Sequence, residues 1–256
     1  MLQTCRMRRM EPPPVEILYE EGPCLAVLKP SGLLTQAPAD IDSIERRLRA
    51  FLKVRDSKSG NIYLGIPHRL DRPVSGVLLF ARHVRACRRL SDQFAGRLVK
   101  KCYWAWVEGS VHPAVGRWED WLQKVPGEAR AEVVSADHVE ARFAALTYRT
   151  LRATPHGSWL EIEPETGRTH QIRVQAGSRG YPILGDSLYG AKVPFGKQYA
   201  DPRQLAIALH ARSIEFRHPM TQELVCVEAP LPAAWRELDA MERPLDLFTF
   251  DDRRPP

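Results

Sequence analysis

Short strand-like runs separated by turns rich in glycine and proline recur along this chain, and they constrain its fold more than any other feature. Residues 15–19 and 24–28 predict a strand pair around Glu21-Gly22-Pro23. The other expected strands cover residues 77–80, 103–107, 145–153, 159–163, 205–217 and 223–228. Because these runs do not alternate with helices as in βαβ units, they predict an α+β protein with a mixed, mainly antiparallel sheet.

Few segments have the spacing of a helix. Asp42 or Ser43 can cap a helix that carries apolar residues on one face, and Gly96 is placed to end a second helix. This second helix is expected at residues 84–94, and two further helices are expected at 169–176 and 233–241. Residues 111–142 combine proline, glycine and mixed charges, which predicts irregular hairpins.

The composition is that of an ordinary soluble globular protein, with 44% hydrophobic and 27% charged residues. No apolar run approaches the ~20 residues that a membrane helix needs, so no membrane association is expected. The five cysteines form no Cys-x-x-Cys pair and the eight histidines no His-x-x-x-His pair. These patterns argue against disulfides and a bound metal, and they favour a cytoplasmic protein.

The net charge of +6 is only weak evidence for nucleic-acid binding. Its distribution is more informative, because residues 82–101 carry seven basic residues against one acid, Asp92. A stripe of one sign favours a phosphate-binding track over a merely solvated helix face. The candidates on this track are Arg85, Arg88 and Arg89.

One carboxylate stands between two arginines directly ahead of an apolar run. Residues 67–80 read Pro-His-Arg-Leu-Asp-Arg-Pro-Val-Ser-Gly-Val-Leu-Leu-Phe, which places Asp71 beside Arg72. An acid beside an arginine is usually a surface ion pair of little energetic value. A second segment weakens that interpretation, since residues 165–174 read Glu-Thr-Gly-Arg-Thr-His-Gln-Ile-Arg-Val.

Together the two segments resemble the RluA-type RNA pseudouridine synthases. That family shows His-Arg-Leu-Asp followed by Ser-Gly, and later Gly-Arg-x-His-Gln-(Ile/Leu)-Arg. The resemblance implies one catalytic domain over residues 15–241, with a bent sheet, flanking helices and a central cleft. A basic, proline-rich tail (1–14) and a C-terminal tail (242–256) would flank it, and the S4-type domain of many relatives is expected to be absent. Val74 and Gln175 replace the Thr and His of many relatives, which leaves the target RNA open.

The resemblance assigns the catalytic role to Asp71. Isomerising uridine breaks the glycosidic bond between C1′ and N1 and joins C5 to C1′, which needs a carboxylate as nucleophile or general base. Whether that carboxylate attacks the sugar, attacks the base or abstracts a proton stays open. Arg173 corresponds to the basic residue that pairs with this aspartate in the family. A guanidinium beside a carboxylate in a closed pocket favours its charged form.

Other roles follow from the same resemblance. Tyr103 would stack on the extruded uracil, although a plain core aromatic is the alternative. Arg69 would fill the gap left by the flipped base, and Ile172 would pack beneath the uracil. Arg168 is assigned to RNA phosphate or to local structure. Scaffold roles are expected for His68, His170, Gln171 and residues 185–190.

The sequence therefore predicts an isomerase that converts specific uridines of rRNA or tRNA to pseudouridine, without a cofactor or metal. Its partner is structured RNA, and we expect a monomer with no obligate protein partner. A non-catalytic RNA-binding protein on the same scaffold is the alternative, which the retained Asp71, Tyr103 and Arg173 disfavour. A nucleoside hydrolase or glycosidase would need a second acid embedded in a motif.

Overall fold

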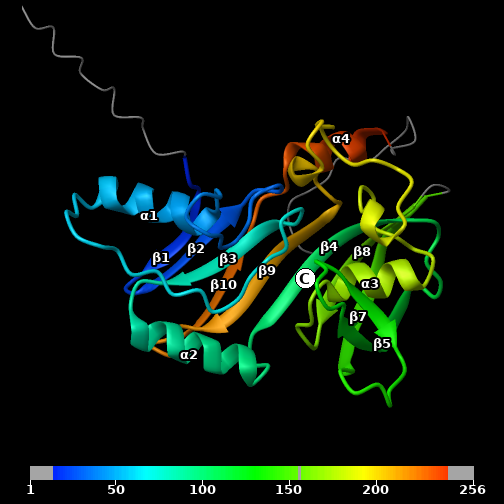
Figure 1. The fold of residues 1–256 in the computed structure, drawn as a ribbon, viewed down its shortest axis with the longest axis horizontal. Coiled ribbons are helices and arrows are strands. Elements are labelled where there is room, and N and C mark those ends of the chain that lie inside the picture. Colours follow the sequence, from blue (N-terminus) through cyan, green and yellow to red (C-terminus); the bar gives the residue numbers. More distant parts are fainter. Residues whose placement is uncertain (1–13, 155–156, 242–256) are drawn as a thin grey trace, which may run out of the picture.

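A mixed sheet of ten strands forms the body of the protein in the computed structural model, which describes residues 14–154 and 157–241 (Figure 1). The strands are β1 (Ile17–Glu21), β2 (Cys24–Lys29), β3 (Ser75–Ala81), β4 (Lys100–Glu108), β5 (Val115–Lys124), β6 (Ala131–Val134), β7 (Arg142–Ala153), β8 (Gly157–Pro164), β9 (Leu209–Arg217) and β10 (Leu224–Glu228). The helices are α1 (Ile44–Arg55), α2 (Val84–Ala95), α3 (Gln171–Ser178) and α4 (Ala233–Met241), with short 3₁₀ turns η1 (Ser187–Tyr189) and η2 (Pro202–Gln204). The α+β class expected from the sequence is confirmed.

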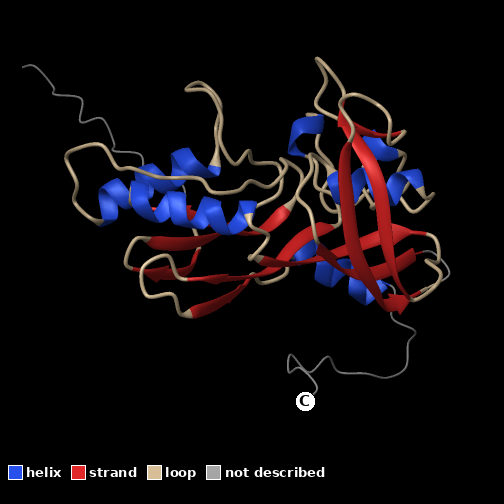
Figure 2. Ribbon diagram, turned by 90° about the horizontal axis from the view of Figure 1, so that it is seen from below, coloured by secondary structure: helices blue, strands red, loops and turns tan. Residues whose placement is uncertain are grey.

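The strands follow the order β1-β2-β3-β9-β4-β8-β7-β5-β6, and β10 pairs with β9. Only the contact between β3 and β9 is parallel, so the described sheet is mixed and mainly antiparallel. Strands β5 and β7 cross the direction of strands β1, β2 and β3 at a steep angle, which shows how strongly the sheet twists (Figure 2). Helices α1 and α2 lie by the β1–β3 end, and α3 lies against the β5–β7 end (Figure 1).

The junction of β3 with β9 explains the Ser-Gly pair of the first motif. Ser75 and Gly76 lie opposite His210 and Ala211. Gly76 has φ 125°, and a Cβ at this position would overlap the backbone of Ala211. Only glycine fits such a close approach of two backbones. The Ser75 hydroxyl lies 2.8 Å from Nδ1 of His210, which fixes the side chain next to this crossing.

Several predicted helix boundaries agree with the structure. Ser43 caps α1, because its hydroxyl accepts a hydrogen bond from the backbone N–H of Arg46 at 3.2 Å. Gly96 ends α2, but it keeps a right-handed conformation, and the left-handed residue is the next one, Arg97, with φ 56°. None of the helices in the described ranges is long and apolar enough to span a bilayer.

The prediction of irregular hairpins at residues 111–142 was right about a hairpin, which β5 and β6 form, but wrong about its irregularity. This segment forms the ten-residue strand β5 and the short strand β6, both antiparallel. Trp118 and Leu122 are buried while Arg117, Glu119 and Trp121 are exposed. This alternation is that of a strand with one covered face, and the charges on the open face hid it in the sequence. The expected tails lie outside the described residues, apart from Pro14.

Candidate active site

The loop that carries Asp71 is held from the β2 side of the sheet. Thr35 makes two hydrogen bonds to Leu70: its hydroxyl donates to the carbonyl at 2.9 Å and accepts from the N–H at 3.1 Å. The N–H of Gly32 donates to the carbonyl of Arg72 at 2.8 Å. The residues on both sides of Asp71 are therefore fixed by backbone contacts, so the carboxylate projects from a defined loop.

Lys29, at the end of β2, is completely buried and holds the same loop. Its ammonium donates to the carbonyls of Pro30 at 2.9 Å, Arg72 at 3.2 Å and Val74 at 2.7 Å. Desolvation lowers the pKa of Lys29 to about 7, against an opposing attraction from Asp71. Three carbonyls match the three donors of an ammonium group, so Lys29 fixes the loop that follows β2 against the loop that carries Asp71.

Arg173 on α3 joins the second motif to the first. Its Nη1 lies 3.4 Å from Oδ2 of Asp71, although the two residues are 102 positions apart. Its other nitrogens form a bidentate pair with the buried Asp186, with Nε to Oδ2 at 2.6 Å and Nη2 to Oδ1 at 2.8 Å. The ring of Tyr189 lies 5.1 Å from the guanidinium carbon. Asp186 is thus the principal partner of Arg173, and Asp71 meets the remaining nitrogen.

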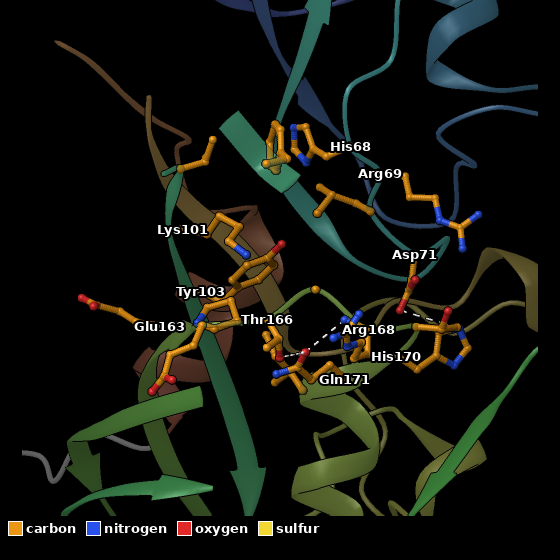
Figure 3. Close-up of a pocket in the computed structure, with 18 of the residues that line it drawn as sticks. His68, Arg69, Asp71, Lys101, Tyr103, Glu163, Thr166, Arg168, His170 and Gln171 are labelled. Carbon is orange, nitrogen blue, oxygen red and sulfur yellow. Dashed lines mark hydrogen bonds and ion pairs between the residues drawn. The ribbon is translucent and has the colours of Figure 1, made fainter. Parts of the chain in front are cut away.

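His170 also approaches Asp71. Its Nε2 lies 3.7 Å from Oδ2 of Asp71 (Figure 3). Its Nδ1 lies 2.9 Å from the hydroxyl of Tyr189. That hydroxyl accepts a hydrogen bond from the backbone N–H of Ala131 at 2.9 Å. Among the described residues, none donates a hydrogen bond to Oδ1 of Asp71.

Asp71, His170 and Arg173 border a cavity of about 790 Å³. Figure 3 shows Tyr103 from β4 on one side of it, and Asp71 and His170 on the other. Ile172, Arg69 and Arg168 also line the cavity. The structure therefore brings together six of the nine predicted site residues: Asp71, Tyr103, Arg173, Arg69, Ile172 and Arg168. A cavity of this size is in the range of about 300–1,000 Å³ that is usual for ligand sites.

Tyr103 is half-buried and packs against the hydrophobic core. Burial, and secondarily the charge of Asp71, raise the pKa of its phenol, which therefore stays protonated at neutral pH. His68 accepts a hydrogen bond at Nε2 from the N–H of Leu79 at 2.9 Å, and its ring stacks on Phe94. Burial lowers the pKa of His68 to about 3, so its ring is neutral and structural.

Buried hydrogen bonds hold the loop of the second motif in place. The Thr166 hydroxyl donates to Oε1 of Gln171 at 2.7 Å, and the amide of Gln171 donates to the carbonyl of Ala145 at 3.0 Å. Arg168 donates through Nε to the carbonyl of Phe143 at 2.9 Å, so one of its nitrogens has a local structural role. Gln171 is thus a buried structural residue that ties this loop to β7.

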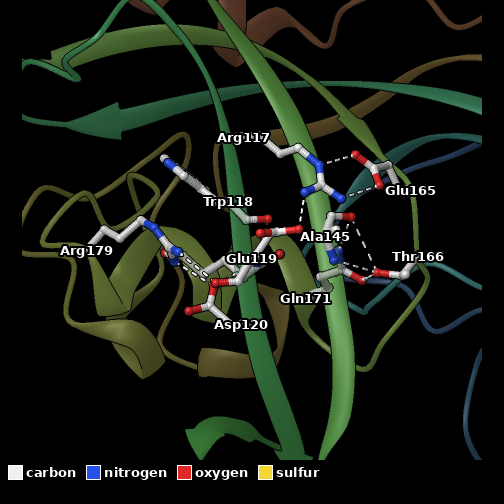
Figure 4. Close-up of polar contacts among 10 residues, drawn as sticks. Arg117, Trp118, Glu119, Asp120, Ala145, Glu165, Thr166, Gln171 and Arg179 are labelled. Atoms are coloured by element: carbon white, nitrogen blue, oxygen red, sulfur yellow. Dashed lines mark hydrogen bonds and ion pairs between the residues drawn. The ribbon is translucent and has the colours of Figure 1, made fainter. Parts of the chain in front are cut away.

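Strand β5 braces the same loop from outside (Figure 4). Arg117 forms a bidentate pair with Glu165, at 2.7 and 2.8 Å, and also contacts Glu119. Asp120 accepts hydrogen bonds from Arg179 and from the amide of Gln175, each at 2.7 Å. The residue that departs from the family pattern at 175 therefore faces β5 and not the cavity.

The basic segment of residues 82–101 is used in several different ways. Arg82 pairs with Glu20 and Asp56, and Lys100 pairs with Glu215. Arg89 donates to the carbonyl of Pro219 at 2.6 Å. Arg85 and Arg88 are exposed on α2, and none of the three predicted arginines lines the cavity; the basic residues of this segment that line it are Arg97, Lys100 and Lys101.

Three residues that shape the site were missed as functional in the sequence: Lys29, His170 and Asp186. The sequence does contain a signal for Asp186, because Gly185-Asp186 and Tyr189-Gly190 form a motif-like run, but nothing local shows that it meets Arg173. Among the described residues, no three His, Cys, Asp or Glu side chains form a group that could hold a metal ion.

Comparisons with known proteins identify the class to which this site belongs. Residues 24–178, more than half of the chain, match the RNA pseudouridylate synthase family. The chain therefore belongs to that family, and it is an RNA uridine isomerase. The family expected from the two motifs is confirmed, and nothing favours the non-catalytic alternative.

Individual relatives agree with this assignment. The chain is 31% identical over 251 residues to the tRNA pseudouridine synthase C of Vibrio vulnificus, an alignment covering 92% of this chain and 98% of that protein. It is 33% identical to the ribosomal large subunit pseudouridine synthase D of Xanthomonas campestris, covering 86% of this chain and 66% of that protein. The fold matches that of human RNA pseudouridylate synthase domain containing 1 with a TM-score of 0.69 and 24% identity, covering 96% and 95% of the two chains.

Proposed function

We propose that this protein is an RluA-type enzyme that converts one or more uridines of rRNA or tRNA to pseudouridine, with Asp71 as the catalytic carboxylate. The observation that carries the proposal is the meeting of Asp71 with the buried Arg173 at the edge of a large cavity. The guanidinium places a positive charge 3.4 Å from the carboxylate that would react. A charged oxygen is what nucleophilic attack or proton abstraction requires.

The other acids of the cavity do not form the pair that a glycosidase needs. Glu165 is exposed and neutralised by Arg117, and Glu163 is exposed at the end of β8. Hydrolysis by two acids requires a second carboxyl group held across the scissile bond. A single fixed carboxylate suits a reaction in which the base stays bound and returns to the same sugar.

The walls of the cavity suit a uracil that has left its stack. Tyr103 offers an aromatic face, and Ile172 offers an apolar surface. Base stacking on an aromatic side chain is worth about 1–3 kcal/mol. Arg69 is exposed at the rim, where it can occupy the space that the extruded base vacates. We infer base flipping from this arrangement.

The target RNA class rests on the relatives. One of them is named for tRNA and another for the ribosomal large subunit, and both share about a third of their residues with this chain.

We infer a monomeric, cytoplasmic enzyme whose catalytic domain spans residues 15–241 and which needs no cofactor, metal or obligate protein partner.

Mapping pseudouridine across total RNA tests the proposal. Cells that lack the gene should lose pseudouridine at one or a few positions of rRNA or tRNA, and the gene restored on a plasmid should return it. The gene carrying Asp71→Asn should fail to return it. An unchanged pseudouridine map in cells that lack the gene would contradict the proposal.

RNA affinity should depend on salt through the basic residues of α2. Changing Arg85, Arg88 and Arg89 to Gln should lower the slope of log affinity against log salt by at most about one per cation, without changing which uridine reacts. We expect Arg89 to contribute least, because its guanidinium donates to Pro219. The measurement is filter binding over a series of salt concentrations.

Arg46→Gln is the matched control, since it removes an exposed arginine from α1, the other helix beside the β1–β3 end of the sheet. It should leave the slope at the wild-type value. A wild-type slope in the triple variant would show that α2 is a solvated face and that RNA follows Arg97 and Lys101 instead.

A further inference from the structure

Two donors approach the same oxygen of Asp71. Arg173 reaches Oδ2 from α3 at 3.4 Å, and Nε2 of His170 reaches it at 3.7 Å. Among the described residues, no hydrogen-bond donor contacts Oδ1. The two oxygens of this cavity-lining carboxylate are therefore unequal, since Oδ2 is restrained by two side chains and Oδ1 has no donor among the described residues.

The hydrogen bond at the other ring nitrogen of His170 sets where its proton lies. The Tyr189 hydroxyl already accepts the N–H of Ala131, so its own hydrogen is available to donate. Nδ1 of His170, at 2.9 Å, is placed to accept it. A neutral imidazole that accepts at Nδ1 carries its proton on Nε2, which faces Asp71.

The backbone of His170 directs its side chain to this place. The residue has φ 53° and ψ 22°, the left-handed region that favours glycine, and it stands directly before α3. Its side chain caps no N–H of that helix. Figure 3 shows the ring turned toward Asp71. The imidazole thus contacts Tyr189 and Asp71 and does not cap the helix.

Charged side chains from three parts of the fold surround His170. Asp71 and Arg69 belong to the loop before β3, Arg173 to α3, and Asp186 and Tyr189 to the segment around η1. Burial lowers the pKa of His170, with Arg173 and Arg69 acting in the same direction and Asp71 and Asp186 opposing them. A pKa below that of a free imidazole favours the neutral ring, which can accept at Nδ1 from the Tyr189 hydroxyl.

We propose that His170 is a positioning residue which, in the Nε2–H form fixed by Tyr189, holds Oδ2 of Asp71 together with Arg173 and so presents Oδ1 to the substrate. This inference rests on the proposed function and extends it, because it assigns separate tasks to the two oxygens of the carboxylate. It also gives Tyr189 a task, since its ring lies over Arg173 while its hydroxyl orients His170.

Kinetics of His170 variants test the task at Oδ2. His170→Ala should lower kcat about 10- to 100-fold with KM for RNA unchanged, which is the loss expected for one hydrogen bond to a charged group if the 3.7 Å contact closes to a hydrogen bond when substrate binds. His170→Gln keeps an N–H that can reach Asp71 and should recover part of the loss. The control, His138→Ala, removes a histidine from an exposed turn between β6 and β7 and should behave as wild type. Unchanged kcat in His170→Ala, or equal losses in the Ala and Gln variants, would overturn the proposal.

Nitrogen NMR of the free protein gives a readout that does not depend on activity. The His170 ring should show a protonated Nε2 and an unprotonated Nδ1 in the wild type. Tyr189→Phe should remove the fixing hydrogen bond and give a mixture of the two forms. A protonated Nδ1 in the wild type would overturn the proposal. If the wild-type protein formed no pseudouridine in any RNA, the proposed function would fail, while the form of the ring would still be decided by these spectra.

Discussion

Asp71→Asn should lower the rate of uridine isomerisation by at least about 10³-fold. A single general acid or base typically contributes about 10²–10⁴-fold, and a nucleophile is indispensable to its reaction. The amide keeps the shape of the side chain and an oxygen that can accept from Arg173. It loses the negative charge that attack or proton abstraction needs. RNA affinity should remain near the wild-type value, because phosphate contacts elsewhere supply most of it. The measurement is pseudouridine formed in a single turnover with enzyme in excess.

The control makes the same chemical change at another acid that lines the cavity. Glu163 is exposed at the end of β8, and Glu163→Gln should leave the rate of isomerisation unchanged. Equal losses in the two variants would indicate a pair of acids and favour glycosidase-like chemistry. Near-normal turnover by Asp71→Asn would remove Asp71 from the reaction altogether.

Local patterns in the sequence were enough to place most elements of the fold. Apolar periodicity, the cap at Ser43 and the turn at Gly22-Pro23 predicted α1 and the β1–β2 pair within a few residues. The pattern failed at β5, where burial of Trp118 depends on its contact with Tyr148 of β7. A strand whose covered face is supplied by distant elements leaves only a weak local signal.

The site was predicted unevenly for the same reason. Asp71 and Arg173 stand in the two motifs, and the same family resemblance gave Tyr103 its role, so the resemblance was enough to bring the three together. The task of Lys29 depends on Val74, which lies 45 positions away. Asp186 matters because it meets Arg173 in space, and no short motif records that contact. Partners that are distant in sequence become visible only when the fold is known.

Arg173→Met should have the second-largest effect, and it should act in two ways. Without the guanidinium, Asp71 loses the cation that lies 3.4 Å from Oδ2 and helps to hold the carboxylate in place, so turnover should fall steeply. Asp186, whose side chain is 2% exposed, would become a buried acid without its bidentate partner. Removing one member of a buried pair costs about 3–5 kcal/mol of folding free energy. Denaturant unfolding and single-turnover rates should therefore both change.

A double variant separates the two effects. Adding Asp186→Asn to Arg173→Met removes the orphaned charge, so the free energy of unfolding should return toward the wild-type value. The rate of isomerisation should stay low, because Asp71 still lacks its cation. Asp186→Asn alone should keep the guanidinium of Arg173 but weaken its bidentate contact with residue 186. The rate of this variant should lie between those of the wild type and Arg173→Met. If the double variant regained activity together with stability, Arg173 would serve the fold and not the carboxylate.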